Sequence, residues 1–72
     1  MERQKLTRVI EYLNSLEYSV KSVKESCVTI SLYLSDGTEY MTTRTINKVR
    51  DIWDNPVNIG VRDGWLVVLL LR

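Results

Sequence analysis

Residues 57–72 read VNIGVRDGWLVVLLLR, and this stretch predicts a β-hairpin that anchors the rest of the fold. Before the turn, apolar residues alternate with polar residues or glycine, as they do in a half-buried strand. Asp63-Gly64 is a strong signal for a two-residue type I′ turn, because both central positions of that turn need positive φ. Residues 65–72 are therefore expected to return antiparallel to residues 57–62.

The strand after this turn is apolar on both of its faces, although a half-exposed antiparallel strand normally alternates. Counting from a two-residue turn places one set of its side chains beside the apolar residues of the preceding strand, which predicts the core face: Leu66, Val68 and Leu70 beside Val61, Ile59 and Val57. The remaining set points to the opposite face: Trp65, Val67, Leu69 and Leu71.

This second face predicts an interaction surface. Two short helices can cover one face of a five-stranded sheet, and an uncovered cluster of large apolar side chains is typical of a binding site. The sequence thus favours a homodimer or a protein partner held by Trp65, Val67, Leu69 and Leu71, most simply with sheet packed against sheet. The alternative is a three-layer monomer, in which the helices lie on opposite faces of the sheet.

Two further elements follow from residue spacing near the start of the chain. Apolar residues at three- and four-residue steps predict an amphipathic helix over residues 3–16. Strict alternation over residues 27–34 predicts a strand with one apolar face, which is formed by Val28, Ile30, Leu32 and Leu34.

Residues 18–26 allow two structures. Their apolar residues continue the three- and four-residue spacing, which could extend the first helix into a short coiled coil. We favour a strand, because serine and valine are poor helix formers and the charge order of a coiled coil is missing. A strand needs a bulge near Lys21 or Ser22 to turn both Val20 and Val23 inward.

Asp36-Gly37 repeats the hairpin signal and predicts a third strand over residues 38–43. A two-residue turn places Leu32 opposite Met41 and Tyr33 opposite Tyr40, whereas a three-residue turn shifts the register by one.

A second helix is expected over residues 45–54, with Thr43 or Thr45 as its cap and Pro56 as a stop. The chain is then a single α+β domain over residues 1–72, in the order α-β-β-β-α-β-β. Its mainly antiparallel sheet has about five strands, and both helices pack on one face. The predicted core is Leu6, Ile10, Leu13, Val28, Ile30, Leu32, Ile46, Val49, Trp53, Ile59, Leu66, Val68 and Leu70.

Composition limits the classes of partner and site. Ten basic and nine acidic residues give a net charge of +1, which lacks the bias expected when phosphate neutralisation dominates binding. With no histidine and with Cys27 as the only cysteine, we expect no metal, no cofactor and no internal disulfide. No signal peptide or membrane-spanning run is recognised, so a cytoplasmic protein without membrane contact is expected.

The alternative function is a dimeric nucleic-acid-binding protein. Aromatic side chains on an open sheet can stack on bases, and basic residues near helix starts can contact phosphate. The candidate contacts are Tyr33, Tyr40, Arg44, Lys48 and Arg50. The order helix, three strands, helix resembles double-stranded-RNA-binding domains, although this chain lacks the lysine pair expected at the start of the second helix and adds a C-terminal hairpin.

Catalysis is not expected. Cys27 has no histidine to act as its base, and Gly37, Gly60 and Gly64 are isolated, so neither a nucleophile nor a phosphate-binding loop is indicated, and no small-molecule substrate is evident. The leading expectation is a small non-enzymatic interaction module. Its size and style are typical of phage or archaeal-virus accessory proteins, which would place it in the cytoplasm of a host cell.

Overall fold

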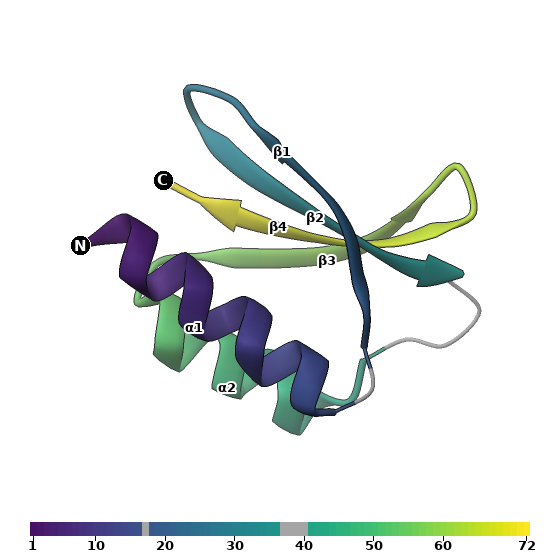
Figure 1. Ribbon diagram of the computed structural model, residues 1–72, viewed down its shortest axis with the longest axis horizontal. Coiled ribbons are helices and arrows are strands. Elements are labelled where there is room, and N and C mark those ends of the chain that lie inside the picture. Colours follow the sequence, from purple (N-terminus) through teal and green to yellow (C-terminus); the bar gives the residue numbers. More distant parts are fainter. Residues whose placement is uncertain (17, 37–40) are drawn as a thin grey trace.

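The computed structural model describes residues 1–16, 18–36 and 41–72. It is an α+β fold, as predicted, with both helices on one side of an antiparallel sheet (Figure 1). The strand order in the sheet is β1-β2-β4-β3, so β2 and β4 are central. The elements in chain order are α1 (Glu2–Ser15), β1 (Val20–Glu25), β2 (Thr29–Asp36), α2 (Thr43–Trp53), β3 (Val57–Arg62) and β4 (Trp65–Leu71).

The hairpin of β3 and β4 has the predicted turn and register. Asp63 and Gly64 have φ values of 53° and 81°, as the two central residues of a type I′ turn require. All three predicted pairs are present: Val57 with Leu70, Ile59 with Val68, and Val61 with Leu66. Because β2 pairs with the other edge of β4, this strand lies inside the sheet and not at its border.

Residues 20–25 form a strand and not an extension of α1, which confirms the preferred prediction. The register of β1 against β2 shifts between Val20 and Ser22, where a bulge was expected. The shift places Val20 opposite Leu34 and Val23 opposite Leu32, so both valines share the face of two buried leucines.

The predicted third strand is wrong in its described part, and the described sheet has four strands. Met41 and Thr42 are not in a strand and Thr43 begins α2, while residues 37–40 lie outside the described residues. Leu32 pairs with Val23 and Val68 and not with Met41. The physical reason is that β4, apolar on both faces, is buried best between two strands. The observed order departs from that of double-stranded-RNA-binding domains.

Helix α2 begins two residues before its predicted start. Thr42 is the N-cap, and its Oγ1 accepts a hydrogen bond of 3.2 Å from the backbone N–H of Thr45, so neither predicted cap is correct. The helix ends at Trp53, and its C-cap Asp54 has a left-handed φ of 61°. Helix α1 lies one residue earlier than predicted at both ends. Neither helix in the described part of the chain is long and apolar enough to cross a membrane.

The core lies between the helices and the sheet, and most of its residues were predicted. Val28 is the exception: it lies in the bend between β1 and β2 and is 67% exposed. Ile10, Ile46 and Ile59 are only partly buried. The Nε1–H of buried Trp53 donates to the carbonyl oxygen of Leu71 at 2.8 Å, which joins the end of α2 to β4. The buried side chains that the sequence did not single out as core are Val9, Leu34, Met41, Val57 and Val67.

Candidate functional site

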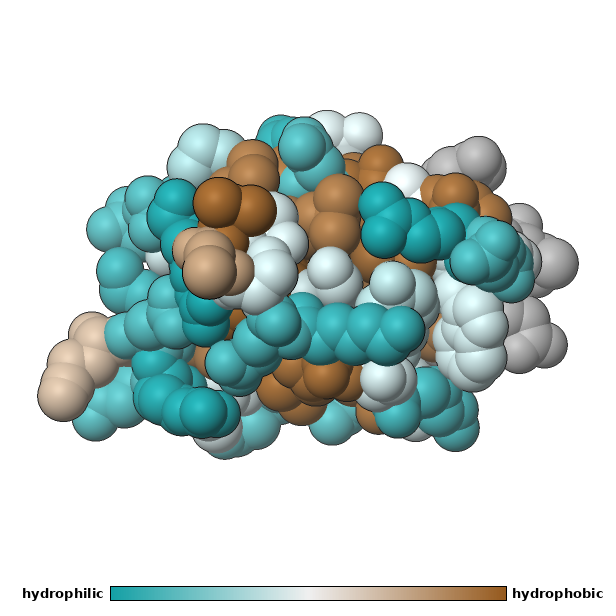
Figure 2. Space-filling model, turned by 90° about the horizontal axis from the view of Figure 1, so that it is seen from above, coloured by the Kyte–Doolittle hydropathy of each residue, from teal (hydrophilic) through white to brown (hydrophobic). Residues whose placement is uncertain are grey.

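The face of the sheet turned away from the helices is the candidate site, and we call it the open face (Figure 1). Directly paired residues of an antiparallel sheet point to the same side. The register therefore assigns to this face four residues of β4 (Trp65, Val67, Leu69 and Leu71) and their neighbours on the other strands: Ser22, Lys24, Thr29, Ser31, Tyr33, Asn58, Gly60 and Arg62. Figure 2 views the molecule from this side and shows hydrophobic (brown) atoms along the face between hydrophilic (teal) side chains.

The four predicted interface residues lie together on this face, but they differ in exposure. Trp65 is 40% exposed, and Leu69 and Leu71 are partly buried. Val67 is only 3% exposed, although no helix lies on this side, so its neighbours within the face must cover it. The expectation that all four would stay uncovered is therefore wrong for Val67. The helices leave this face open, as the sequence predicted, and the three-layer alternative is excluded.

An aromatic and cationic hollow lies at the Trp65 end of the open face. It has a volume of about 280 Å³ and is lined by Ser22, Lys24, Tyr33, Asp63 and Trp65. The Nζ atom of Lys24 lies 5.3 Å from the centre of the Tyr33 ring, within the range of a cation–π contact. Such a hollow can hold a planar or apolar group against the two rings.

Sequence reasoning did not place Lys24 in this site. Lys24 reaches Tyr33 because β1 is the neighbour of β2 on that side. The predicted bulge near Lys21 was the available signal, because it fixes which residues of β1 share a face with Tyr33.

Gly60 forms a notch in the open face. It pairs with Val67 from β3, and a Cβ atom added to it would meet no atom within 4 Å. Its φ is outside the left-handed region, so the backbone does not require glycine. Glycine inside a strand weakens it and often marks a place where another group approaches closely. Among the described residues, none lies within 4 Å of a Cβ position at Gly60 to account for the missing side chain.

Two of the predicted nucleic-acid contacts, Arg44 and Lys48, lie together, but away from Tyr33. Arg44 and Lys48 lie on α2, on the far side of the sheet from Tyr33, where they line a hollow of about 440 Å³ with Tyr12, Asn47 and Asp51. The Nη2 atom of Arg50 donates to the carbonyl oxygen of Val57 at 3.3 Å. Tyr40, the remaining predicted contact, lies outside the described residues.

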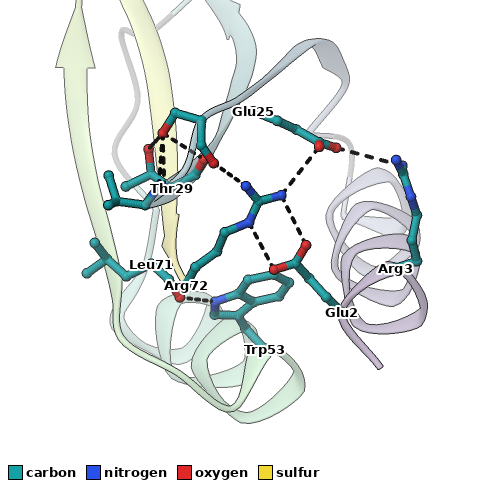
Figure 3. A network of polar contacts seen from close by, with 9 residues as sticks. Glu2, Arg3, Glu25, Thr29, Trp53, Leu71 and Arg72 are labelled. Atoms are coloured by element: carbon teal, nitrogen blue, oxygen red, sulfur yellow. Dashed lines mark hydrogen bonds and ion pairs between the residues drawn. The ribbon is translucent and has the colours of Figure 1, made fainter.

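A cluster of charged groups around Arg72 joins three parts of the fold (Figure 3). The Nε and Nη2 atoms donate to the two carboxylate oxygens of Glu2 in α1 at 2.9 and 3.0 Å, and Nη2 also reaches Glu25 of β1 at 3.3 Å. The Nη1 atom donates to the carbonyl oxygen of Ser26. The hydrogen bonds to Glu2 raise the pKa of Arg72 above its ordinary value against the opposing loss of hydration, and the charges of Glu2 and Glu25 add to the rise.

These contacts make the Arg72 cluster structural. A cavity of about 150 Å³ lies beside it, lined by Met1, Glu2, Lys5, Trp53, Asn55 and Arg72. The guanidinium group already donates to two carboxylates and a carbonyl, so it has little capacity left for an anionic ligand.

The concave surface along the first turns of α1 carries no comparable arrangement among its described residues. It has a volume of about 500 Å³, and in it Arg3 already pairs with Glu25 at 3.7 Å and Lys5 with Asp54 at 3.8 Å. Within residues 1–16, 18–36 and 41–72, no three cysteine, aspartate or glutamate side chains gather into a group that could hold a metal ion. Cys27 is exposed in the bend between β1 and β2.

Comparison with protein-family models, with curated proteins and with solved structures finds no match to this chain, so its function must be argued from its own residues.

Proposed function

We propose that this chain is a small non-enzymatic interaction module that self-associates through the open face of its sheet. One observation carries the proposal: both helices lie on the same side of the sheet, while a central strand presents Trp65, Leu69 and Leu71 to the other side. Trp65, with 40% of its surface exposed, is the most accessible large apolar side chain of this strand. Tryptophan in such a position is typical of interaction sites.

The layout of the open face supports a protein interface. Its apolar residues run along β4, and polar residues border them: Lys24 on β1, with Asn58 and Arg62 on β3. An apolar centre within a polar rim is the usual anatomy of such interfaces. Full burial of a large apolar side chain contributes about 1.5 to 3 kcal/mol. Because Leu69 and Leu71 are already partly buried, each contributes less than this range.

The size of the open face fits a weak dimer. Four strands about 4.8 Å apart, each about seven residues long at about 3.3 Å per residue, give a plan area of about 440 Å². Standard interfaces bury about 800 Å² of accessible surface on each partner, and weak ones less than about 600 Å². A dimer formed by this face alone therefore falls in the size class of weak, transient interfaces.

A second copy of the chain is the simplest partner. A single core rarely contributes more than about 3 to 5 kcal/mol net in chains below about 70 to 80 residues, and a subunit interface is one common supplement. The chain has one cysteine and no histidine, so an internal disulfide and a histidine-based metal site are not available to it. We propose the cytoplasm as the site of action, where such disulfide-free chains are usual.

Leu69→Lys tests the proposal. Leu69 lies in the middle of β4 between Ser31 and Asn58, so a charge there would be buried in the dimer yet could reach solvent in the monomer. Light scattering at about 200 µM should show mainly dimer for the wild type and monomer for Leu69→Lys. Thr7→Lys, on the exposed face of α1, is the matched control and should remain dimeric. Equal masses for all three proteins would contradict the proposal, provided that circular dichroism shows each to be folded.

Binding of single-stranded nucleic acid is the alternative proposal for this face. It is favoured by the hollow between Lys24, Tyr33 and Trp65, where a base could stack on an aromatic ring beside a cation. This affinity would fall steeply with salt, whereas an apolar dimer interface is nearly indifferent to it. Unchanged migration of labelled single-stranded DNA or RNA at low salt would exclude this alternative.

A further inference from the structure

We infer that the second copy docks about a two-fold axis running along β4, so that Tyr33 of each protomer lies over Gly60 of the other. The inference rests on the proposed self-association and adds its geometry. It follows from the large side chain of Tyr33, which we call the ridge, and from the open space above Gly60, which we call the notch. The ridge and the notch lie on opposite sides of β4.

The ridge and the notch share one row of the sheet. Tyr33 of β2 and Gly60 of β3 both pair directly with Val67 of β4, from opposite sides. Each therefore lies about 4.8 Å from β4, one strand spacing away. Tyr33 carries a large side chain, whereas the space above Gly60 is empty out to 4 Å from a Cβ position. A large aromatic residue and the smallest residue of this face thus flank Val67 symmetrically.

A two-fold axis along β4 superposes these two features. In a two-fold interface, residue i of one copy contacts residue j of the other, and residue j contacts residue i. Rotation about β4 exchanges the β2 side of the face with the β3 side, so each Tyr33 meets a Gly60. The aromatic ring of each protomer then fills the notch of the other protomer.

The next row of the sheet is compatible with the same axis. Ser31 of β2 and Asn58 of β3 both pair with Leu69, so the rotation places the hydroxyl of Ser31 near the amide of the partner's Asn58. These two groups can form a hydrogen bond. Packed sheets lie about 10 Å apart with strands about 30° from aligned, a gap that side chains from both faces fill.

The axis also accounts for glycine at position 60. The φ angle there is outside the left-handed region, and a Cβ atom would meet nothing within 4 Å. Valine would fit a strand better, because glycine is depleted in strands and valine enriched. A partner's aromatic ring occupying the notch gives the missing side chain a physical cause.

Gly60→Val tests the inference in the full-length chain. Filling the notch should raise the dimer Kd at least about tenfold, measured by sedimentation equilibrium, because Tyr33 no longer fits. The same change should leave the unfolding midpoint of the dilute monomer unchanged or higher. Thr7→Val is the control: it introduces the same side chain on the exposed face of α1, outside the proposed interface, and should shift the Kd by less than about threefold.

A double variant identifies the contact itself. Tyr33→Ala removes the ridge, so the protein with both Tyr33→Ala and Gly60→Val should dimerise more tightly than Gly60→Val alone. The inference would be overturned if the loss of dimerisation free energy in the double variant equalled the sum of the losses in the two single variants. The inference would also be overturned if the dimer Kd of Gly60→Val lay within about twofold of the wild-type Kd while Leu69→Lys is monomeric. That result would support the self-association and contradict only the proposed geometry. A wild type that never dimerises would refute the proposed function and the inference together.

Discussion

Arg72 shows at the residue scale how one side chain holds separate segments together. Its guanidinium group joins the start of α1 through Glu2 to the end of β1 through Glu25, and its backbone N–H donates to the carbonyl oxygen of Val28 at 3.0 Å. A bidentate contact between arginine and a carboxylate fixes orientation as well as charge. These contacts restrain one end of the sheet against the helical layer.

Arg72→Gln should lower the midpoint of thermal unfolding more than Arg8→Gln, which changes an exposed arginine of α1. Hydrogen bonding to Glu2 raises the pKa of Arg72. A group whose pKa is higher in the folded protein than in the unfolded protein stabilises the fold. This stabilisation is fully present at pH values below the unfolded-state pKa and is lost only as the pH rises through the folded-state pKa. The difference in unfolding midpoint between the two variants should therefore be the same at about pH 7 and at about pH 10. It should become smaller in about 1 M salt. A difference that disappears by pH 10 would contradict this assignment.

At the scale of elements, the position of α2 depends on its N-cap. The hydroxyl of Thr42 accepts a hydrogen bond from the N–H of Thr45 and also lies 3.0 Å from the hydroxyl of Thr45. This cap starts the helix early enough to bury Thr45, Val49 and Trp53 against the core.

Thr42→Ala should destabilise the protein by about 1 kcal/mol, because a first-turn N–H of α2 loses its acceptor. Urea unfolding gives the free energy of this change. Thr43→Ala, an exposed neighbour that is not the cap, should cost less than about 0.5 kcal/mol. Equal losses for both variants would show that the cap does not set the stability of this helix.

The elements that sequence reasoning predicted are those with local causes. The turn at Asp63-Gly64, the bulge before Ser22 and both helices follow from residues close to one another in the chain. The partner of β2 did not follow, because Asp36-Gly37 favoured a local hairpin whereas the sheet pairs β2 with β4, whose paired residues lie 29 to 42 positions away. Local patterns do not encode which distant strand becomes the neighbour.

The candidate site was likewise predicted only in part, where its residues follow from a local pattern. Its four β4 residues were predicted from their alternation along one strand, and the structure keeps them on one face. Lys24 was not assigned to it, because its membership depends on the order of strands in the sheet. Val67 was expected to be exposed and is buried, since its neighbours within the face cover it.

At the scale of the whole molecule, the proposed function follows from the arrangement of the fold in two layers. One layer of two helices covers one face of the described sheet (Figure 1), and the opposite face carries Tyr33, Gly60 and partly exposed leucines. The chain is small enough that burying this face in a dimer would add appreciably to its stability, and its dimer should unfold at a higher temperature as concentration rises.

Sedimentation velocity of the wild-type chain tests the central claim most directly. Between about 5 µM and about 500 µM, the average mass should rise from that of one chain towards that of two. The rise should be nearly the same in about 50 mM and about 200 mM salt, because the proposed interface is mainly apolar. The mass of a single chain at every concentration, in both salts, would contradict the account.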